Sequence, residues 1–190
     1  MAQEEQRRSN DTKPSTPSTR RGSKGGRWQT GLGCAGILFF AFIFLLPDLL
    51  RPRISANESF AIGDVRAVIL AQREYAKANG GHFDTLNCLA QPSECLPSYS
   101  VELPAFLSEP LDGVRNGYVR EFIPGPPAEG DAVSGSSIQS YVFTVYPVKS
   151  GTTGVRSFCG GASGAIYMNV TGARITAVDG GCDPRFPFLE

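Results

Sequence analysis

The pattern of apolar and polar residues changes abruptly near residue 50. From Gly31 to Leu46 the sequence GLGCAGILFFAFIFLL contains no charged residue. The 23 residues between Arg27 and Arg51 would extend about 34 Å as a helix, enough to cross a hydrocarbon core of about 30 Å. Residues 30–50 are therefore predicted to form a transmembrane helix.

Beyond this run, apolar residues recur at helical spacing among charged ones. In residues 51–79, Ile62, Val65 and Ile69 lie on one stripe of a helix with 3.6 residues per turn. A Gly-Gly pair then supplies a C-terminal stop. Residues 51–79 are predicted to form an amphipathic helix that lies on a small domain.

Two prolines, Pro47 and Pro52, lie where the two segments meet. A proline can bend a helix or end it. We expect one long helix, whose first half faces lipid or other subunits and whose second half packs on the domain. Two helices separated by a break at the prolines are the alternative, and they would leave the domain merely tethered.

Residues 80–190 combine turn formers with short β-rich stretches. Strands are predicted at residues 117–123, 140–148, 154–160 and 164–170, with 173–178 as a short fifth candidate. Residues 80–110 are interpreted as a connection, and 112–117 and 159–164 as turns. A helix on a small antiparallel meander is an α+β fold. Its predicted core contains the following residues: Ile62, Val65, Ile69, Phe83, Phe106, Phe122, Tyr141, Phe143, Phe158 and Ile166.

The formal net charge is zero, but the basic residues are unevenly placed. Residues 1–29 carry seven Lys or Arg and three Asp or Glu, a net charge of +4. Basic residues beside one end of a span predict that this end is cytoplasmic, with residues 51–190 on the other side. Because they cluster only there, no nucleic-acid partner is predicted.

The composition of residues 1–29, rich in Ser, Thr, Pro, Gly, Arg and Gln, predicts a disordered tail. A cleaved secretory signal is the rival interpretation of the tail and the apolar run together. The sequence PDLLRPR that follows the run lacks a small-x-small cleavage pattern, so a membrane anchor is favoured.

The sequence LLPDLLRPRISANESFAIGDVRAVILAQREYA, residues 45–76, resembles the N-terminal helix of type IV pilins and type II secretion pseudopilins. The match rests on Pro47, the tract Leu49–Arg51, Arg53 and ISANES at residues 54–59. The later stretches SYVFTVYPVKSGTTGVRSF and SGAIYMN resemble hairpin strands of small pilins. The resemblance covers residues 45–80 strongly and 117–170 more loosely.

The resemblance implies a pilin-like fold, with one long N-terminal helix packed on an antiparallel sheet of about four strands. It implies a non-enzymatic protein of the bacterial inner membrane, with a cytoplasmic N-terminus and a periplasmic domain. Its partners would be membrane lipid, other pilin-like subunits, further copies of itself or assembly-machine proteins of a type IV pilus or type II secretion system. A tethered periplasmic binding module that never polymerises is the alternative.

The prepilin signal of this chain departs from the family pattern. Gly25 and Gly26 stand at the possible processing site, but the sequence after them is RWQTG. Thr30 or a neighbour occupies the position of the family's glutamate, which pairs with a neighbouring subunit's N-terminal amine. Buried charges need such partners, so incorporation into a filament depends on whether this chain is processed.

Four of the five cysteines lie outside the apolar run, and Cys34 lies within it. An even count in an exported domain predicts disulfides rather than a metal site. Cys88 and Cys95 would close a short loop. Cys159 and Cys182 would tie the C-terminal segment to a strand, much as C-terminal disulfide loops do in pilins. The other two pairings remain open.

Little in the sequence predicts catalysis. His82 is the sole histidine, and beside a Gly-Gly pair at a helix end it is interpreted as a surface or capping residue. Asp179 and Asp183 could hold calcium, as a C-terminal loop does in some pseudopilins, but the ligand pattern is not matched. No cofactor, metal or enzymatic activity is predicted.

Overall fold

The computed structural model describes the backbone of residues 29–130 and 134–189, and side chains from residue 53 onward within those ranges. Contacts divide the chain into two units, 1–43 and 44–190, and the folded domain belongs to the second. The possible processing site at Gly25 and Gly26 lies outside the described residues, as do residues 1–28 of the predicted tail. Over the described part of the chain, no helix is both long and apolar enough to cross a membrane. The side chains of the predicted span, residues 30–50, are not among those described.

Helix α1 (Gln29–Ala78) is a single helical element whose bounds include both prolines. Its described side chains, from residue 53, show the amphipathic pattern that the sequence predicts: Val65 and Val68 are fully buried and Leu70 is exposed. The helix ends at a glycine in the left-handed region, Gly80 (φ 63°), where glycine is the least strained residue.

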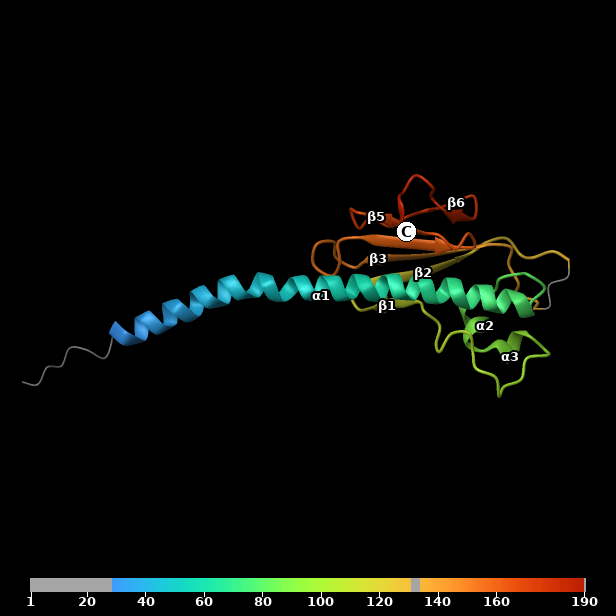
Figure 1. Ribbon diagram of the computed structural model, residues 1–190, viewed down its shortest axis with the longest axis horizontal. Helices are drawn as coiled ribbons and strands as arrows, with labels where there is room; N and C mark the ends of the chain where they lie inside the picture. The colour runs from blue at the N-terminus through green and yellow to red at the C-terminus, as the bar shows by residue number, and fades with distance from the viewer. Residues whose placement is uncertain (1–28, 131–133, 190) are drawn as a thin grey trace, which may run out of the picture. The chain divides into compact units, whose positions relative to one another are not determined.

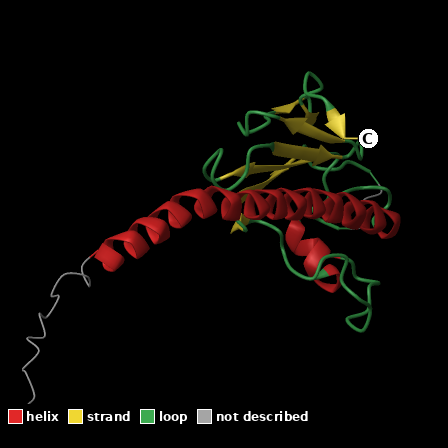
Figure 2. Cartoon of the chain, turned by 60° about the vertical axis from the view of Figure 1, so that its left-hand side comes forward, coloured by secondary structure: helices red, strands yellow, loops and turns green. Residues whose placement is uncertain are grey.

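Six antiparallel strands form the main sheet, in the order β1-β2-β3-β4-β5-β8. Their bounds are β1 (Gly113–Arg115), β2 (Tyr118–Pro124), β3 (Tyr141–Pro147), β4 (Ser157–Gly161), β5 (Ile166–Asn169) and β8 (Phe188–Leu189). The sheet lies along the second half of α1 (Figures 1 and 2). The α+β class with an antiparallel sheet is therefore confirmed.

The expected number of about four strands was wrong, because both edge strands were missed. β1 occupies part of a stretch that was interpreted wholly as a turn. Only Asn116 and Gly117 form that turn, with φ of 48° and 72°, as in a two-residue hairpin loop. β8 is two residues long, too short to show the alternation that identifies a strand. The predicted turn at 159–164 begins too early, since β4 continues to Gly161.

A second, two-stranded sheet joins β6 (Ala177–Val178) to β7 (Gly181–Cys182). Its turn, Asp179–Gly180, again has two positive φ values, 50° and 75°. The fifth strand predicted at residues 173–178 is correct only at its last two residues, and it does not belong to the main sheet.

Two short helices, α2 (Leu86–Ala90) and α3 (Pro92–Cys95), lie in the segment that was interpreted as a connection (Figure 2). Thr85 caps α2 by accepting a hydrogen bond from the backbone N–H of Cys88 (3.4 Å). Helices of five and four residues are too short for a 3.6-residue period to reveal them in a sequence.

The inner face of the sheet meets α1, and the main core lies between them. Of the predicted core residues, six are buried: Val65, Ile69, Tyr141, Phe143, Phe158 and Ile166. The other four are partly buried and pack against this cluster: Ile62, Phe83, Phe106 and Phe122. The prediction missed Tyr118, Leu89 and Leu96, which are among the largest fully buried side chains.

The outer face of the sheet carries a smaller apolar cluster. Its buried members are Val142, Cys159, Ile175 and Cys182. Hydrogen bonds to the carbonyl of Ala173 from Ser157 Oγ (2.5 Å) and Asn169 Nδ2 (3.0 Å) hold the covering segment in place. The C-terminal segment thus covers a face that α1 does not reach.

Candidate functional site

The first described turns of α1 are fixed to the β3–β4 connection by two polar residues. Asn57 Nδ2 donates to the carbonyl of Thr153 (2.9 Å). Glu58 Oε1 accepts hydrogen bonds from the backbone N–H groups of Val155 (2.9 Å) and Arg156 (3.0 Å). The Arg156 guanidinium donates to Glu58 Oε2 through Nε (2.9 Å) and Nη2 (2.6 Å). The ISANES stretch that carries the pilin resemblance is therefore where the helix is held to the sheet domain.

The environment of Glu58 keeps it ionised. Burial alone would raise the pKa of this carboxyl group, but hydrogen bonds from Arg156 and Val155, with the charge of Arg156, outweigh it. The net effect is a pKa below the ordinary value. The clamp between Glu58 and Arg156 is thus formed by charged partners at neutral pH.

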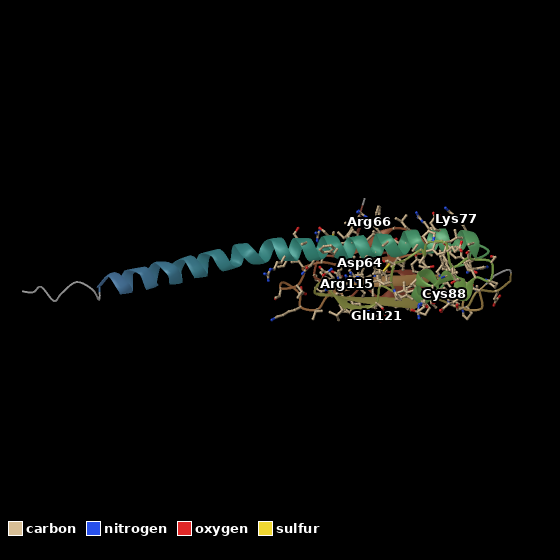
Figure 3. The ribbon with its side chains drawn as sticks, turned by 90° about the horizontal axis from the view of Figure 1, so that it is seen from below. Asp64, Arg66, Lys77, Cys88, Arg115 and Glu121 are labelled. Carbon is tan, nitrogen blue, oxygen red and sulfur yellow. A yellow bond between two sulfur atoms is a disulfide. The ribbon has the colours of Figure 1, made fainter. Side chains whose placement is uncertain are left out.

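A second ion pair joins the middle of α1 to β2. Asp64 Oδ2 accepts a hydrogen bond from Arg120 Nε (2.7 Å), and Nη2 of the same guanidinium also contacts it. The Arg120 side chain is 1 % exposed, and its Nη1 donates to the carbonyl of Arg115 (2.7 Å). Figure 3 shows Asp64 on α1 facing the part of the domain that contains Arg115. Arg120 is thus a buried charge that is paired and hydrogen-bonded, as its burial requires.

A polar network surrounds the end of α1 at the fully buried Asp84. Tyr75 Oη and Ser136 Oγ donate to its two carboxylate oxygens at 3.0 and 2.8 Å. Gln72 exchanges two hydrogen bonds with the Asp84 backbone, at 2.5 and 3.1 Å. Burial and the nearby Asp84 charge raise the pKa of Tyr75 well above its usual range. The Tyr75 hydroxyl is therefore a neutral hydrogen-bond donor at neutral pH.

The residues considered for chemistry form no shared site among the described residues. His82 is half-buried in the turn after α1, where its carbonyl accepts a hydrogen bond from Asn79 Nδ2 (3.1 Å). Asp183 is engaged by Arg185, whose guanidinium and backbone N–H lower its pKa. Asp179 lies exposed in the β6–β7 turn. In the described ranges, no group of three or more His, Cys, Asp or Glu is placed to hold a metal ion.

The structure contains two disulfides, Cys88–Cys95 and Cys159–Cys182. The first connects α2 to the end of α3, with Cα atoms 5.6 Å apart. The second links β4 to β7 across the outer face, with Cα atoms 5.9 Å apart. These are the pairs given by the sequence analysis. Both stabilise the domain mainly by restricting the unfolded chain.

One groove of about 330 Å³ lies between α1 and the β5–β8 edge of the sheet, and we call it the basic groove. Its lining includes Arg66, Ile69, Leu70, Arg73, Ile166 and Leu189. Leu70 is 59 % exposed, and neither arginine forms an ion pair with another described residue. Figure 3 shows Arg66 on the side of α1 away from Cys88. The groove combines an apolar floor with two free positive charges.

A second surface feature lies in the loop after α3. Residues 79–114 contain five Asp or Glu and no Lys or Arg. Within them Tyr99 Oη donates to the carbonyl of Pro104 (2.7 Å), which closes residues 99–104 into a compact unit, the acidic loop. Val101 and Leu103, on either side of Glu102, are 82 % and 52 % exposed. The loop therefore presents an apolar–acidic–apolar tip.

Comparison with protein-family models, with curated proteins and with solved structures found no match for this chain. The function is therefore argued from its own residues. The sequence alone did not identify the groove that Arg66 and Arg73 line. The signal that could have indicated a docking surface is the absence of Lys and Arg from residues 79–114.

Proposed function

We propose that this protein is a pilin-like, membrane-anchored subunit or accessory of a type IV pilus or type II secretion-type assembly. It would act by association and not by catalysis. The observation that carries the proposal is a difference between the two halves of α1. The helix is held to an antiparallel sheet by its second half, whereas residues 31–46 in its first half form an uncharged apolar run.

The contacts of the sheet domain support this difference between the two halves of the helix. Among the described side chains of α1, the first that hydrogen-bond to the sheet domain are Asn57 and Glu58, through the β3–β4 connection. From there to Tyr75 the buried stripe of the helix is occupied by the sheet. The apolar residues 31–46 would contact lipid or the helices of other subunits. This is the arrangement expected of an anchored subunit that assembles through its N-terminal helix.

The interior polar groups also support a structural role. Glu58 and Asp64 each pair with an arginine of the sheet domain. Asp84 is surrounded by the hydroxyl groups of Tyr75 and Ser136. These groups fix α1 against the domain, and each of them has a hydrogen-bond partner within it. Their arrangement accounts for the polar residues of the core without a reaction.

Mass spectrometry of the mature N-terminus in the native membrane is the experiment that tests the proposal. Processing after Gly25 or Gly26, combined with co-purification of other pilin-like subunits or assembly-machine proteins, is the expected result. Variants Gly25→Ala and Gly26→Ala, made separately and together, should then accumulate with the tail attached. Extraction of the wild-type chain by alkaline carbonate would reject the anchor.

The tethered binding module remains the second candidate, because RWQTG follows the glycines where the prepilin pattern differs. An N-terminus that begins at residue 1 or 2, in a chain that stays in the membrane and co-purifies with no pilin-like subunit, would favour it. The same preparation therefore separates the two functions.

A further inference from the structure

We infer that the basic groove of one copy of this chain receives the acidic loop of a second copy, in a head-to-tail contact. The inference rests on the proposed function, because it names a partner for an associating subunit. It is carried by the described residues of the sheet domain and does not use the N-terminal half of α1.

The groove has the chemistry of a site for an apolar segment that carries a carboxylate. Ile69 and Ile166 form a buried floor, and Leu70 lies exposed on the helix beside them. Arg66 and Arg73 lie two helical turns apart on the same wall. The Arg73 guanidinium lies against Gly164, where a side chain would collide with it. The β4–β5 turn therefore leaves room for this arginine, whose planar guanidinium suits bidentate recognition of a carboxylate.

The acidic loop has the complementary pattern in a preformed shape. Glu102 lies between two exposed apolar residues, Val101 and Leu103. Hydrogen bonds from the backbone N–H groups of Glu102 and Leu103 to Ser100 (3.2 and 3.1 Å) fix the tip. Tyr99 packs on Phe106, with ring centroids 5.2 Å apart. Because the tip is ordered before binding, little conformational entropy is lost when it docks.

The two surfaces cannot meet within one chain. The groove lies at the β5–β8 edge of the sheet, and the loop precedes β1, which is the opposite edge. In Figures 1 and 2, α2 and α3 lie on the other side of α1 from β5. A contact between different patches of identical chains is heterologous, so each copy retains one free groove and one free loop. Such contacts build chains of subunits instead of closed dimers, unless the rotation closes a ring.

A contact made by one short loop is small and therefore weak in dilute solution. Confinement to a membrane surface raises the local concentration of both patches, and this raises the occupancy of the contact without new interactions. Opposite charges across it make it sensitive to salt. The contact would therefore act as an addition to packing between membrane helices.

The test uses the full chain in detergent and two complementary variants. The groove variant is Arg66→Glu with Arg73→Glu, and the loop variant is Val101→Ser with Glu102→Gln, so that the two altered surfaces do not attract each other. Sedimentation velocity over a concentration series should show salt-sensitive oligomers for the wild type. Each variant alone should associate at least tenfold more weakly. An equimolar mixture should form heterodimers and nothing larger, because it contains one intact groove and one intact loop.

A matched control carries the same change of charge elsewhere: Lys149→Glu with Arg174→Glu should associate like the wild type. Thermal unfolding of every variant confirms that the domain is folded. Wild-type association by the groove variant, or a mixture that stays monomeric, overturns the inference. Stronger association on deletion of Glu190 would also overturn the inference, because the chain's own C-terminus would then be the occupant of the groove. Loss of processing or of co-purifying subunits overturns the proposed function and leaves this self-association readout unaffected.

Discussion

The two faces of the main sheet are covered in different ways. On the inner face one long helix buries large side chains, including Tyr141, Phe143 and Phe158. On the outer face the covering segment contains two strands of two residues each, and two of the four buried cluster members are disulfide cysteines. No disulfide between described residues joins α1 to the sheet. The inner face is thus stabilised by apolar burial and the outer face largely by a covalent link.

This difference indicates what a small domain with one helix and one sheet needs. A single helix supplies one wide apolar stripe, and once that stripe is used the second face has no comparable partner. A disulfide compensates by restricting the unfolded chain, without requiring a large core. The outer face therefore depends more on a disulfide for its integrity than the contact between α1 and the inner face does.

The sharpest way to break the inner face is Phe143→Ala. Phe143 is fully buried in the main core, so removing its ring should lower the free energy of unfolding by about 3–5 kcal/mol. Denaturant unfolding of the full chain in detergent measures the change. Tyr146→Ala, on the same strand but on the outer face and only half-buried, is the matched control and should cost clearly less. Equal losses of stability would contradict the conclusion that apolar burial contributes more on the inner face than on the outer face.

The outer face should be broken by Cys159→Ala with Cys182→Ala. The cysteines are separated by 23 residues, and the loop-entropy model gives a loss of about 3 kcal/mol. Cys88→Ala with Cys95→Ala, whose cysteines are separated by 7 residues, should cost about 1 kcal/mol less. The same denaturant measurement ranks the two variants. Proteolysis should also cleave residues 173–187 first in the Cys159–Cys182 variant, and a uniform cleavage pattern would argue against a locally dependent face.

Close packing at the inner face is tested by Gly160→Ala. A Cβ at this position would lie 2.6 Å from Val65 Cγ1 and 2.8 Å from Ile69 Cδ1, so α1 would have to move away from β4. We expect a loss of about 1–3 kcal/mol. Gly63→Ala is the control, since a Cβ there meets nothing within 4 Å. It should raise stability by up to about 1 kcal/mol through helix propensity.

The comparison also explains what the sequence could predict. The helix stripe at Val65 and Ile69, and the alternation of Tyr141 and Phe143, are local periodic patterns, so the inner face was predictable from residue spacing. The outer face is held by contacts across long sequence separations, such as Ser157 with Ala173, and these have no local periodicity. Its disulfide was found only because cysteines are few and the resemblance to pilins suggested the pairing.

The interaction surfaces were harder to predict for a related reason. Arg66 and Arg73 are visible in the sequence as exposed helix positions, but the groove beside them needs β8, which is two residues long. The polar clamp at Glu58 is similar, because its partner Arg156 lies 98 positions away. Sequence patterns identify which side chains are exposed or buried, and the topology of the sheet decides which of them meet.

The smallest effects on stability are expected from two ion pairs at the edges of the faces, Glu58–Arg156 on the inner face and Glu121–Arg174 on the outer face. The pH dependence of stability distinguishes the two pairs. On the inner face, the pKa of Glu58 is below its ordinary value of 4.5. The folded state therefore favours the ionised form, and its contribution to stability is complete above the ordinary pKa and is lost as pH falls through the lower, folded-state pKa. Glu58→Gln should cost about 1–2 kcal/mol at pH 7. It should also remove this part of the pH dependence, so wild type and variant converge on acidification.

On the outer face, Arg174 pairs with Glu121 at 2.7 Å, and both side chains are more than a third exposed. Solvent screens such a pair, so Arg174→Ala should change stability by no more than about 0.5 kcal/mol at pH 7. Its stability curve between pH 3 and pH 7 should run parallel to that of the wild type. Denaturant titrations of the three proteins across this range make the comparison. If Arg174→Ala removed as much acid sensitivity as Glu58→Gln, the two ion pairs would be equivalent, and the pair of Glu58 with Arg156 would have no special part in holding α1 to the sheet.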